Sequence, residues 1–238
     1  MLTLAFETSA KAASVALLDG TRLLGESYQN TGLTHSQTLM VMAENLIASC
    51  GYTPQQIEAV AVAAGPGSFT GIRIGVAAAK GFAWGKELPC YGVSTLEAMA
   101  LNLGVFDGYV VPVMDARRSQ VYTATFRAEQ GMLTRIRDDR AISLAELGED
   151  IKNCEKPVFF VGDGSILCYN TLKDSIPLLV YPPEHRMHQR AAGVGLAAAQ
   201  LIEVGFPGNA GELTPNYLRL SQAERDRAEK LQKEKGDR

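Results

Sequence analysis

The sequence lacks the features that mark a metal centre, a disulfide scaffold or a membrane-spanning protein. Its 238 residues include three histidines and four cysteines, and no two cysteines form a Cys-x-x-Cys pair. Scattered cysteines are typical of a reducing compartment and argue against disulfides or structural zinc. No apolar run approaches the roughly 20 residues that a membrane helix needs. No basic leader precedes the first apolar stretch, which Glu7 interrupts. We therefore expect a cytoplasmic protein.

An excess of positive charge is also absent. Lys and Arg number 23 against 26 Asp and Glu, so the net charge is −3. Proteins that bind nucleic acid by themselves are usually basic, so we expect any nucleic-acid role to be indirect. Hydrophobic residues make up 46% and charged residues 21%, which is ordinary for a folded globular protein.

Familiar catalytic motifs are missing as well. The chain has no Gly-x-Ser-x-Gly, and no Gly-Lys-Ser/Thr follows its glycine-rich segment, which excludes a P-loop. His185 and His188 lack the spacing and the glutamate of a zinc-protease helix, and a surface loop explains them better. His35 is expected to cap or pack at the start of a helix. No catalytic or metal-binding residue is therefore assigned.

What the sequence does contain is a repeated order of strands and helices, and each half begins with a three-stranded meander. In the first half the predicted strands are 2–6, 14–18, 22–28, 57–63 and 89–93, and the predicted helices are 34–50, 70–86 and 94–103. In the second half the strands are 109–114, 120–126, 133–136, 158–161 and 178–181, and the helices are 144–153, 165–173 and 188–204.

This repetition predicts a duplicated α/β fold of two lobes, and one continuous α/β sheet is the alternative. We place an N-terminal lobe at residues 1–105, which binds a partner, and a more divergent C-terminal lobe at 106–221. Residues 222–238 hold six basic and five acidic residues and form a charged tail. We interpret the tail as solvated, and an arm that docks on a partner is the alternative.

The most distinctive segment is the glycine-rich run from Gly65 to Gly71, which joins an apolar strand to a helix. The N–H groups at a helix start can hold an anion, although a tight turn capped by Ser68 or Thr70 explains the run equally well. Small residues recur along the helix at Gly71, Gly75 and Ala78 or Ala79. Such a stripe allows close backbone approach, either to the chain's own sheet or to another protein.

A carboxylate ends the first strand of each half, Glu7 in one and Asp115 in the other. Two such carboxylates could flank a metal–phosphate between the lobes. Against this, Arg117 and Arg118 would neutralise Asp115, and polar strand ends are the plainer interpretation. The candidate nucleotide-binding residues on this hypothesis are Glu7, Thr8, Ser9, Gly65, Gly67 and Ser68.

The predicted helix 34–50 has an unusually wide apolar arc, because Met40, Val41 and Met42 extend it beyond one narrow stripe. A helix with so wide an arc is either deeply buried or faces a partner as well as its own core.

Several of these segments together resemble the TsaB (older name YeaZ) family of bacterial tRNA threonylcarbamoyladenosine-biosynthesis proteins. The similarity is strong to about residue 125 and continues weakly to 215–219. The matching segments are Glu7-Thr8-Ser9, Thr34-His35-Ser36, Gly65 to Gly75, Val93 to Glu97, and Asp115-Ala116-Arg117.

The resemblance implies two ribonuclease-H-like lobes of the actin/Hsp70/sugar-kinase (ASKHA) superfamily. It also implies pairing with the catalytic paralogue TsaD, which the ATPase TsaE joins. TsaD transfers a threonylcarbamoyl group to N6 of adenosine 37 in tRNAs that read codons starting with A. The chain departs from this paralogue in two places. Residues 93–99 lack its metal-binding histidines, and residues 115–119 lack its second phosphate loop.

These departures imply a non-catalytic scaffold or activating subunit without an intrinsic cofactor, with ATP or ADP at the interface of the complex. The alternative is an ATP-dependent phosphotransferase of the same superfamily.

The resemblance, the wide arc and the stripe together place the partner-binding face on helices 34–50 and 70–86. The expected contact residues are Leu39, Met40, Met42, Ala43, Leu46, Gly75 and Ala79. Alone, the chain is expected to form a homodimer, and Met42→Asp is expected to weaken pairing without unfolding the lobe.

Overall fold

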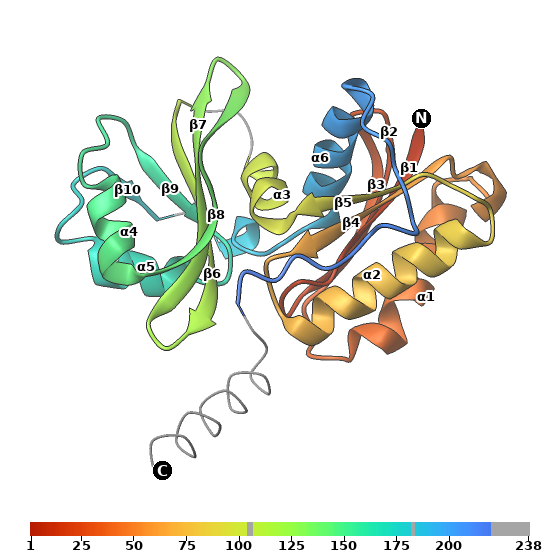
Figure 1. The fold of residues 1–238 in the computed structure, drawn as a ribbon, viewed down its shortest axis with the longest axis horizontal. Helices are drawn as coiled ribbons and strands as arrows, with labels where there is room; N and C mark the ends of the chain where they lie inside the picture. Colours follow the sequence, from red (N-terminus) through yellow and green to blue (C-terminus); the bar gives the residue numbers. More distant parts are fainter. Residues whose placement is uncertain (104–106, 182–183, 220–238) are drawn as a thin grey trace, which may run out of the picture.

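A computed structural model describes residues 1–103, 107–181 and 184–219, which form two α/β lobes side by side (Figure 1). Each lobe contains a five-stranded mixed sheet. The first sheet has the order β3-β2-β1-β4-β5 and the second the order β10-β9-β6-β7-β8, so β6 of the second lobe corresponds to β1 of the first. The predicted duplication is therefore confirmed, and the alternative of one continuous sheet is wrong.

The first lobe has helices on both faces of its sheet. Its strands are β1 (Leu2–Glu7), β2 (Ala13–Asp19), β3 (Arg22–Gln29), β4 (Ala59–Gly65) and β5 (Cys90–Ser94). One face carries α1 (His35–Ser49) and α2 (Phe69–Trp84), and the other carries α6 (Ala191–Glu203). Along β1, Leu4 and Phe6 belong to the core under α1 and α2, whereas Ala5 belongs to the core under α6. Because both faces are covered, β1 and β4 are buried along their whole length.

The second lobe repeats this plan. Its strands are β6 (Gly108–Arg117), β7 (Gln120–Glu129), β8 (Met132–Ser143), β9 (Val158–Val161) and β10 (Leu179–Val180). Helices α4 (Leu144–Ile151) and α5 (Ser165–Leu172) pack on one face, and α3 (Thr95–Asn102) packs on the other, between the lobes. Short 3-10 helices cover Pro54–Gln56 and Glu184–Arg186. Both lobes thus share the strand order of the predicted duplicated two-lobe fold.

The C-terminal segments do not follow the predicted division at residues 106–221. Helix α6 belongs to that range, yet it packs on the first sheet, where Val194 and Ala198 meet Ala5 and Ala61. Small residues make this possible: a Cβ on Gly195 would lie 2.2 Å from a methyl group of Leu18 in β2. The predicted boundary at residues 105 and 106 and the tail 222–238 lie outside the described residues.

Two elements differ from their predicted lengths. Strand β8 has twelve residues rather than the four at 133–136, because it is an edge strand whose charged side chains break the apolar pattern. The last helix begins at Ala191 rather than at residue 188. In the described part of the chain, no helix is both long and apolar enough to cross a membrane.

Candidate functional site

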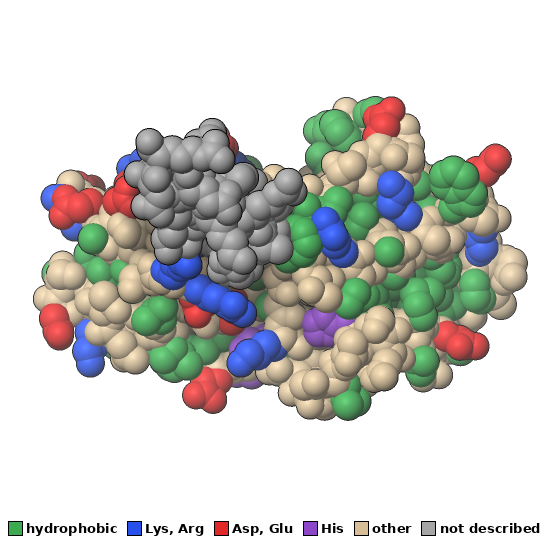
Figure 2. Space-filling view, turned by 60° about the horizontal axis from the view of Figure 1, so that its bottom comes forward, with side chains coloured by type: hydrophobic (Ala, Val, Ile, Leu, Met, Phe, Trp, Pro, Cys, Tyr) green, Lys and Arg blue, Asp and Glu red, His purple; other side chains and the backbone are tan. Residues whose placement is uncertain are grey.

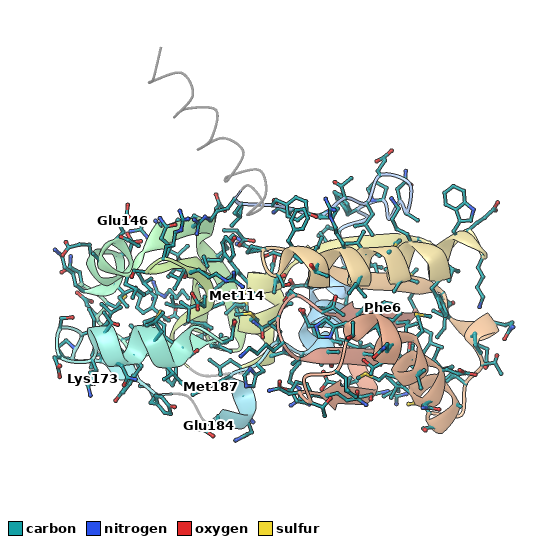
Figure 3. All side chains as sticks on the ribbon, turned by 90° about the horizontal axis from the view of Figure 1, so that it is seen from below. Phe6, Met114, Glu146, Lys173, Glu184 and Met187 are labelled. Atoms are coloured by element: carbon teal, nitrogen blue, oxygen red, sulfur yellow. The ribbon has the colours of Figure 1, made fainter. Side chains whose placement is uncertain are left out.

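A cleft of about 490 Å³ lies between the lobes. Its walls come from the loop after β1, the start of α2, the β6–β7 hairpin and residues 216–219. Figure 3 places Met114 at this junction and Phe6 within the first lobe. One of the two sequence hypotheses placed a site between the lobes at the ends of β1 and β6, and the structure places Ser9 and Asp115 in one cleft.

The glycine-rich run of residues 65–71, called the glycine turn below, packs its backbone against the end of β1. A Cβ on Gly67 would lie 2.5 Å from the Ser9 carbonyl oxygen, and one on Gly71 would lie 2.1 Å from that of Thr8. The Ser68 N–H donates to the Ser9 carbonyl at 2.6 Å, and the Gly71 N–H donates to Ser68 Oγ at 3.3 Å. The tight turn with a Ser68 cap is thus confirmed. The N–H groups of Ser68 and Gly71, which could otherwise bind an anion, already donate hydrogen bonds within the chain.

The small-residue stripe of α2 faces the chain's own sheet. A Cβ on Gly75 would lie 2.4 Å from Thr8 Oγ1 and 3.3 Å from a methyl group of Val62. The Thr8 hydroxyl also donates to the Gly71 carbonyl at 2.7 Å. The stripe therefore lets α2 approach β1 and β4 closely, as one of the two sequence interpretations predicted.

Glu7 lies behind the cleft and is fully buried. Its Oε1 accepts a hydrogen bond from the Ser9 N–H at 2.6 Å, whereas its Oε2 has no partner among the described residues. Burial raises the pKa of Glu7 from 4.5 to about 7, and the charge of Asp163 also acts to raise it. Near neutral pH this carboxyl group is therefore about half protonated.

Asp163 is a site residue that sequence reasoning missed. It follows β9 in the run Gly162-Asp163-Gly164, which corresponds to the glycine turn after β4 in the first lobe. Its Oδ1 accepts a hydrogen bond at 3.0 Å from the amide of Gln189, a fully buried side chain. Loss of solvent raises the pKa of Asp163, and the charge of Asp115 adds to this. The matching glycine runs after β4 and β9 were the signal that could have identified it.

Residues 209–219, called the C-terminal strap below, cross from the first lobe to the second. The Asn216 N–H donates to the Ala64 carbonyl at 2.7 Å, and the Tyr217 ring stacks on Phe69 at 4.7 Å. Arg219 donates to the Ala116 carbonyl at 2.8 Å. Sequence reasoning did not assign the strap to the site, since its contacts join segments that lie far apart in the chain.

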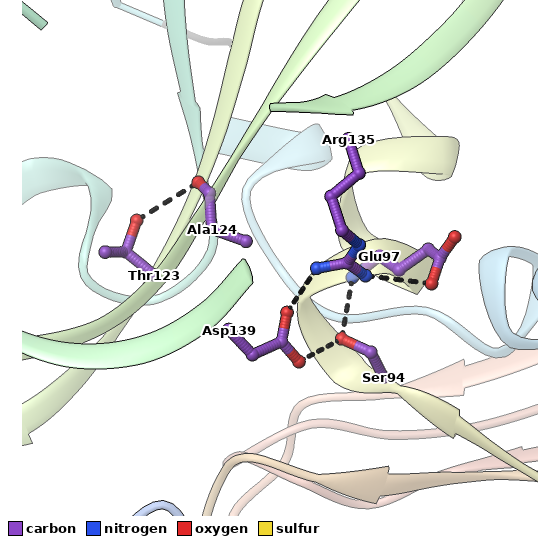
Figure 4. A network of polar contacts seen from close by, with 6 residues as sticks. All are labelled: Ser94, Glu97, Thr123, Ala124, Arg135 and Asp139. Atoms are coloured by element: carbon purple, nitrogen blue, oxygen red, sulfur yellow. Dashed lines mark hydrogen bonds and ion pairs between the residues drawn. The ribbon is translucent and has the colours of Figure 1, made fainter. Parts of the chain in front are cut away.

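A polar network also joins the lobes (Figure 4). Arg135 on β8 contacts Asp139 at 2.6 Å and Glu97 of α3 at 2.9 Å. The Ser94 hydroxyl donates to Asp139 at 2.5 Å and caps α3 by accepting the Glu97 N–H. Ser94 and Glu97 lie in the segment where the paralogue TsaD is expected to carry histidines. Here that segment links the lobes.

Six of the seven expected partner-contact residues are buried within the first lobe, which corrects that prediction. They are Leu39, Met42, Ala43, Leu46, Gly75 and Ala79. The apolar periodicity of α1 marks the side that packs on the sheet, so it selected the core. Met42 is 4% exposed, so Met42→Asp would disturb the core rather than a surface, and Met40 alone of the seven is exposed, at 43%.

Other apolar side chains do face solvent on α1 and α2. Val41 is 55% exposed and Trp84 is 74% exposed. The exposed apolar residues at these helices, called the α1–α2 face below, are Leu33, Met40, Val41, Ala48, Ala77 and Trp84. Figure 2 shows hydrophobic side chains spread over the first lobe on this side.

Comparisons with known proteins agree on one family. The family model described as "TsaD: tRNA N6-adenosine threonylcarbamoyltransferase" matches residues 29–226. The Bacillus subtilis protein named tRNA threonylcarbamoyladenosine biosynthesis protein TsaB is 34% identical over 227 residues, covering 94% of this chain and 96% of the relative. The Escherichia coli protein of the same name is 35% identical over 150 residues, covering 62% of this chain and 64% of the relative.

Solved structures show the same fold. YeaZ from Pseudomonas aeruginosa superposes with a TM-score of 0.73 at 24% identity, covering 91% of this chain and 99% of that one. The resemblance first inferred from the strand ends and the glycine turn thus holds over almost the whole chain. The chain belongs to the TsaB (YeaZ) family, whose curated members are named as tRNA threonylcarbamoyladenosine biosynthesis proteins.

Proposed function

We propose that this chain is a non-catalytic scaffold or activating subunit. It pairs with a TsaD-type catalytic subunit, which a TsaE-type ATPase joins. The complex transfers a threonylcarbamoyl group to N6 of adenosine 37 in tRNAs that read codons starting with A. The observation that carries the proposal is the exposed α1–α2 face. Exposed apolar groups on two neighbouring helices mark a candidate interaction site. Met40 and Val41 are 43% and 55% exposed, so burying the exposed part of each under a partner would contribute roughly 0.7–1.5 kcal/mol.

The state of the cleft supports a scaffold role. The N–H groups of Ser68 and Gly71 at the glycine turn are satisfied within the chain, and residues 93–99 hold no histidine. A polar group that already has an internal partner has less to offer a ligand. ATP or ADP would then bind at the junction with the catalytic subunit rather than in this chain alone. In the absence of that subunit, the α1–α2 face would cover itself in a homodimer.

Native mass spectrometry of the chain, alone and mixed with a TsaD-type subunit, tests the pairing. Val41→Asp places a charge on the α1–α2 face, and Val204→Asp is a matched control, because Val204 is 78% exposed at the end of α6 on the opposite side of the sheet. We expect the first variant to weaken both the homodimer and the mixed dimer at least tenfold, and the second to pair normally.

The possible results test the scaffold function and the position of the binding face separately. If the unmodified chain forms no mixed species, the scaffold function falls. If Val41→Asp pairs as well as Val204→Asp does, the function stands and the α1–α2 face is wrong.

One observation favours a second candidate, an ATP-dependent phosphotransferase. Carboxylates of both lobes, Glu7 and Asp163, lie close enough that the charge of Asp163 helps to raise the pKa of Glu7, beside a cleft of about 490 Å³. On this alternative, nucleotide would contact Glu7, Thr8, Ser9 and the glycine turn at Gly65, Gly67 and Ser68. ATP turnover by the purified chain, lost in Glu7→Ala, would support it. Absence of turnover by the folded chain would exclude it.

A further inference from the structure

The cations of the second lobe are mostly paired with carboxylates. Arg127 and Lys156 both contact Glu129, at 3.0 and 2.9 Å, and Arg137 contacts Asp150 at 3.3 Å. Such pairs cancel charge locally and leave little field for a ligand.

The cations at the lobe junction differ. Lys11 and Arg117 are exposed and line the cleft, and within the described residues neither forms an ion pair. Arg73 donates to the hydroxyl of Tyr217 at 2.9 Å, and Arg219 donates to a backbone carbonyl. None of these four, called the junction cations below, is neutralised by a described carboxylate. Figure 2 shows Lys and Arg side chains on both sides of the junction.

Two exposed carboxylates, Asp115 and Asp163, also line the cleft, against the three cations Lys11, Arg117 and Arg219. Asp115 turns back to accept the N–H of Arg117 at 2.7 Å. Asp163 accepts a hydrogen bond from the buried Gln189, and its side chain is exposed to solvent. With Arg73 beside the cleft, cations therefore outnumber carboxylates four to two among these described residues.

An aromatic ring completes the opening. Tyr217 is 38% exposed, lines the cleft and stacks with one face on Phe69, with Arg73 beside both rings. Cations interleaved with exposed aromatic rings are the combination that binds a nucleic-acid strand: the cations take phosphates, and the ring takes a base.

We propose that the junction cations bind the phosphodiester backbone of an RNA that runs across the opening of the cleft. The inference rests on the proposed function, in which the complex acts on tRNA. A polyanion fits better than a free nucleotide, since the junction cations come from both lobes and from the C-terminal strap, and a strand with several phosphates can contact all of them. The net charge of −3 does not oppose this, because binding responds to the local field rather than to the sum over the chain.

The test uses the full chain in complex with its TsaD-type subunit and a fluorescently labelled tRNA, with anisotropy measured over a range of salt concentrations. The variant Lys11→Gln with Arg117→Gln removes two junction cations whose side chains make no hydrogen bond or ion pair with the described residues. The control, Arg22→Gln with Lys173→Gln, removes two exposed cations far from the cleft, and Figure 3 shows Lys173 on the second lobe away from the junction.

We expect the variant to lower the slope of log K against log salt by about 1.4–1.8, at 0.7–0.9 for each phosphate that is no longer neutralised. At 0.15 M salt this corresponds to affinity weaker by roughly 15- to 30-fold. The control should retain the slope and affinity of the unmodified complex.

Three results would overturn the inference. The first is a slope that is the same in the variant and the unmodified complex. The second is an equal loss in the control, which would indicate a general effect of charge. The third is micromolar AMP or ATP binding by the chain alone that Lys11→Gln with Arg117→Gln abolishes, since the cations would then serve a free nucleotide. Native mass spectrometry of each variant reports pairing separately, so failure of RNA binding is distinguishable from failure of the scaffold function.

Discussion

Glu7 makes the stability of the first lobe depend on pH in a direction that can be worked out. Its pKa is raised from 4.5 to about 7 by burial, so the folded state favours the neutral acid more than the unfolded state does. The stabilising contribution of the protonated form is therefore fully present below pH 4.5 and is lost as the pH rises through 7.

The size of the effect follows from the two pKa values. A separation of one unit corresponds to 1.36 kcal/mol, so the shift of Glu7 amounts to about 3 kcal/mol in total. Between pH 5 and pH 8 the linkage relation predicts that Glu7 lowers the free energy of unfolding by about 2.5 kcal/mol. Glu7→Gln retains an acceptor for the Ser9 N–H but cannot ionise, so it should not show this loss.

Urea denaturation at several pH values measures the difference in unfolding free energy between Glu7→Gln and the unmodified chain. That difference should change by about 2.5 kcal/mol in favour of the glutamine variant from pH 5 to pH 8. Glu155→Gln, at an exposed position, controls for the loss of one carboxylate. A difference that stays constant over this range would refute a raised pKa at Glu7.

Two further predictions concern packing in the first lobe. Met42→Asp places an unpaired charge in the core and should lower the unfolding free energy in urea by about 3–5 kcal/mol, and an unchanged midpoint would show that Met42 is not core. Gly75→Ala should destabilise by about 1–2 kcal/mol, because its Cβ would lie 2.4 Å from Thr8 Oγ1. Gly81→Ala on the same helix has open space and should be neutral or stabilising by up to about 1 kcal/mol, so equal effects at both glycines would contradict the close approach.

The sequence predicted the two sheets because their signals are local. Apolar runs end at carboxylates or glycines, and helical caps such as Ser143 with Glu146 are visible within four residues. The placement of α6 on the first sheet was not predictable in this way. This placement depends on Ala5 and Ala61 of the first sheet, whose small side chains leave room for the alanines of α6. Because these residues lie far from α6 in the sequence, no local pattern indicates that the helix packs on them.

The candidate site was likewise predictable only where its contacts are local in the sequence. The Ser68 cap and the contact of the glycine turn with its own sheet could be inferred, since both lie within or beside one motif. The C-terminal strap could not, because its hydrogen bonds to Ala64 and Ala116 join segments more than a hundred residues apart. The partner-contact residues were mostly wrong for a related reason. Periodicity identifies the most apolar side of α1, which is the side that the sheet covers, and the solvent-facing Val41 lies outside that pattern.

The two glycine runs indicate why an RNA-modifying role is compatible with a cleft that is poorly suited to bind phosphate. In the first lobe, the backbone donors of Ser68 and Gly71 are satisfied by Ser9 and by the Ser68 hydroxyl. In the second lobe, the corresponding run carries Asp163, whose charge repels phosphate. Both glycine runs thus disfavour an anion, while the exposed Lys11 and Arg117 favour one. The proposal of an RNA strand across the junction therefore rests on the exposed cations of both lobes rather than on the glycine runs, and the salt dependence of tRNA binding tests those cations directly.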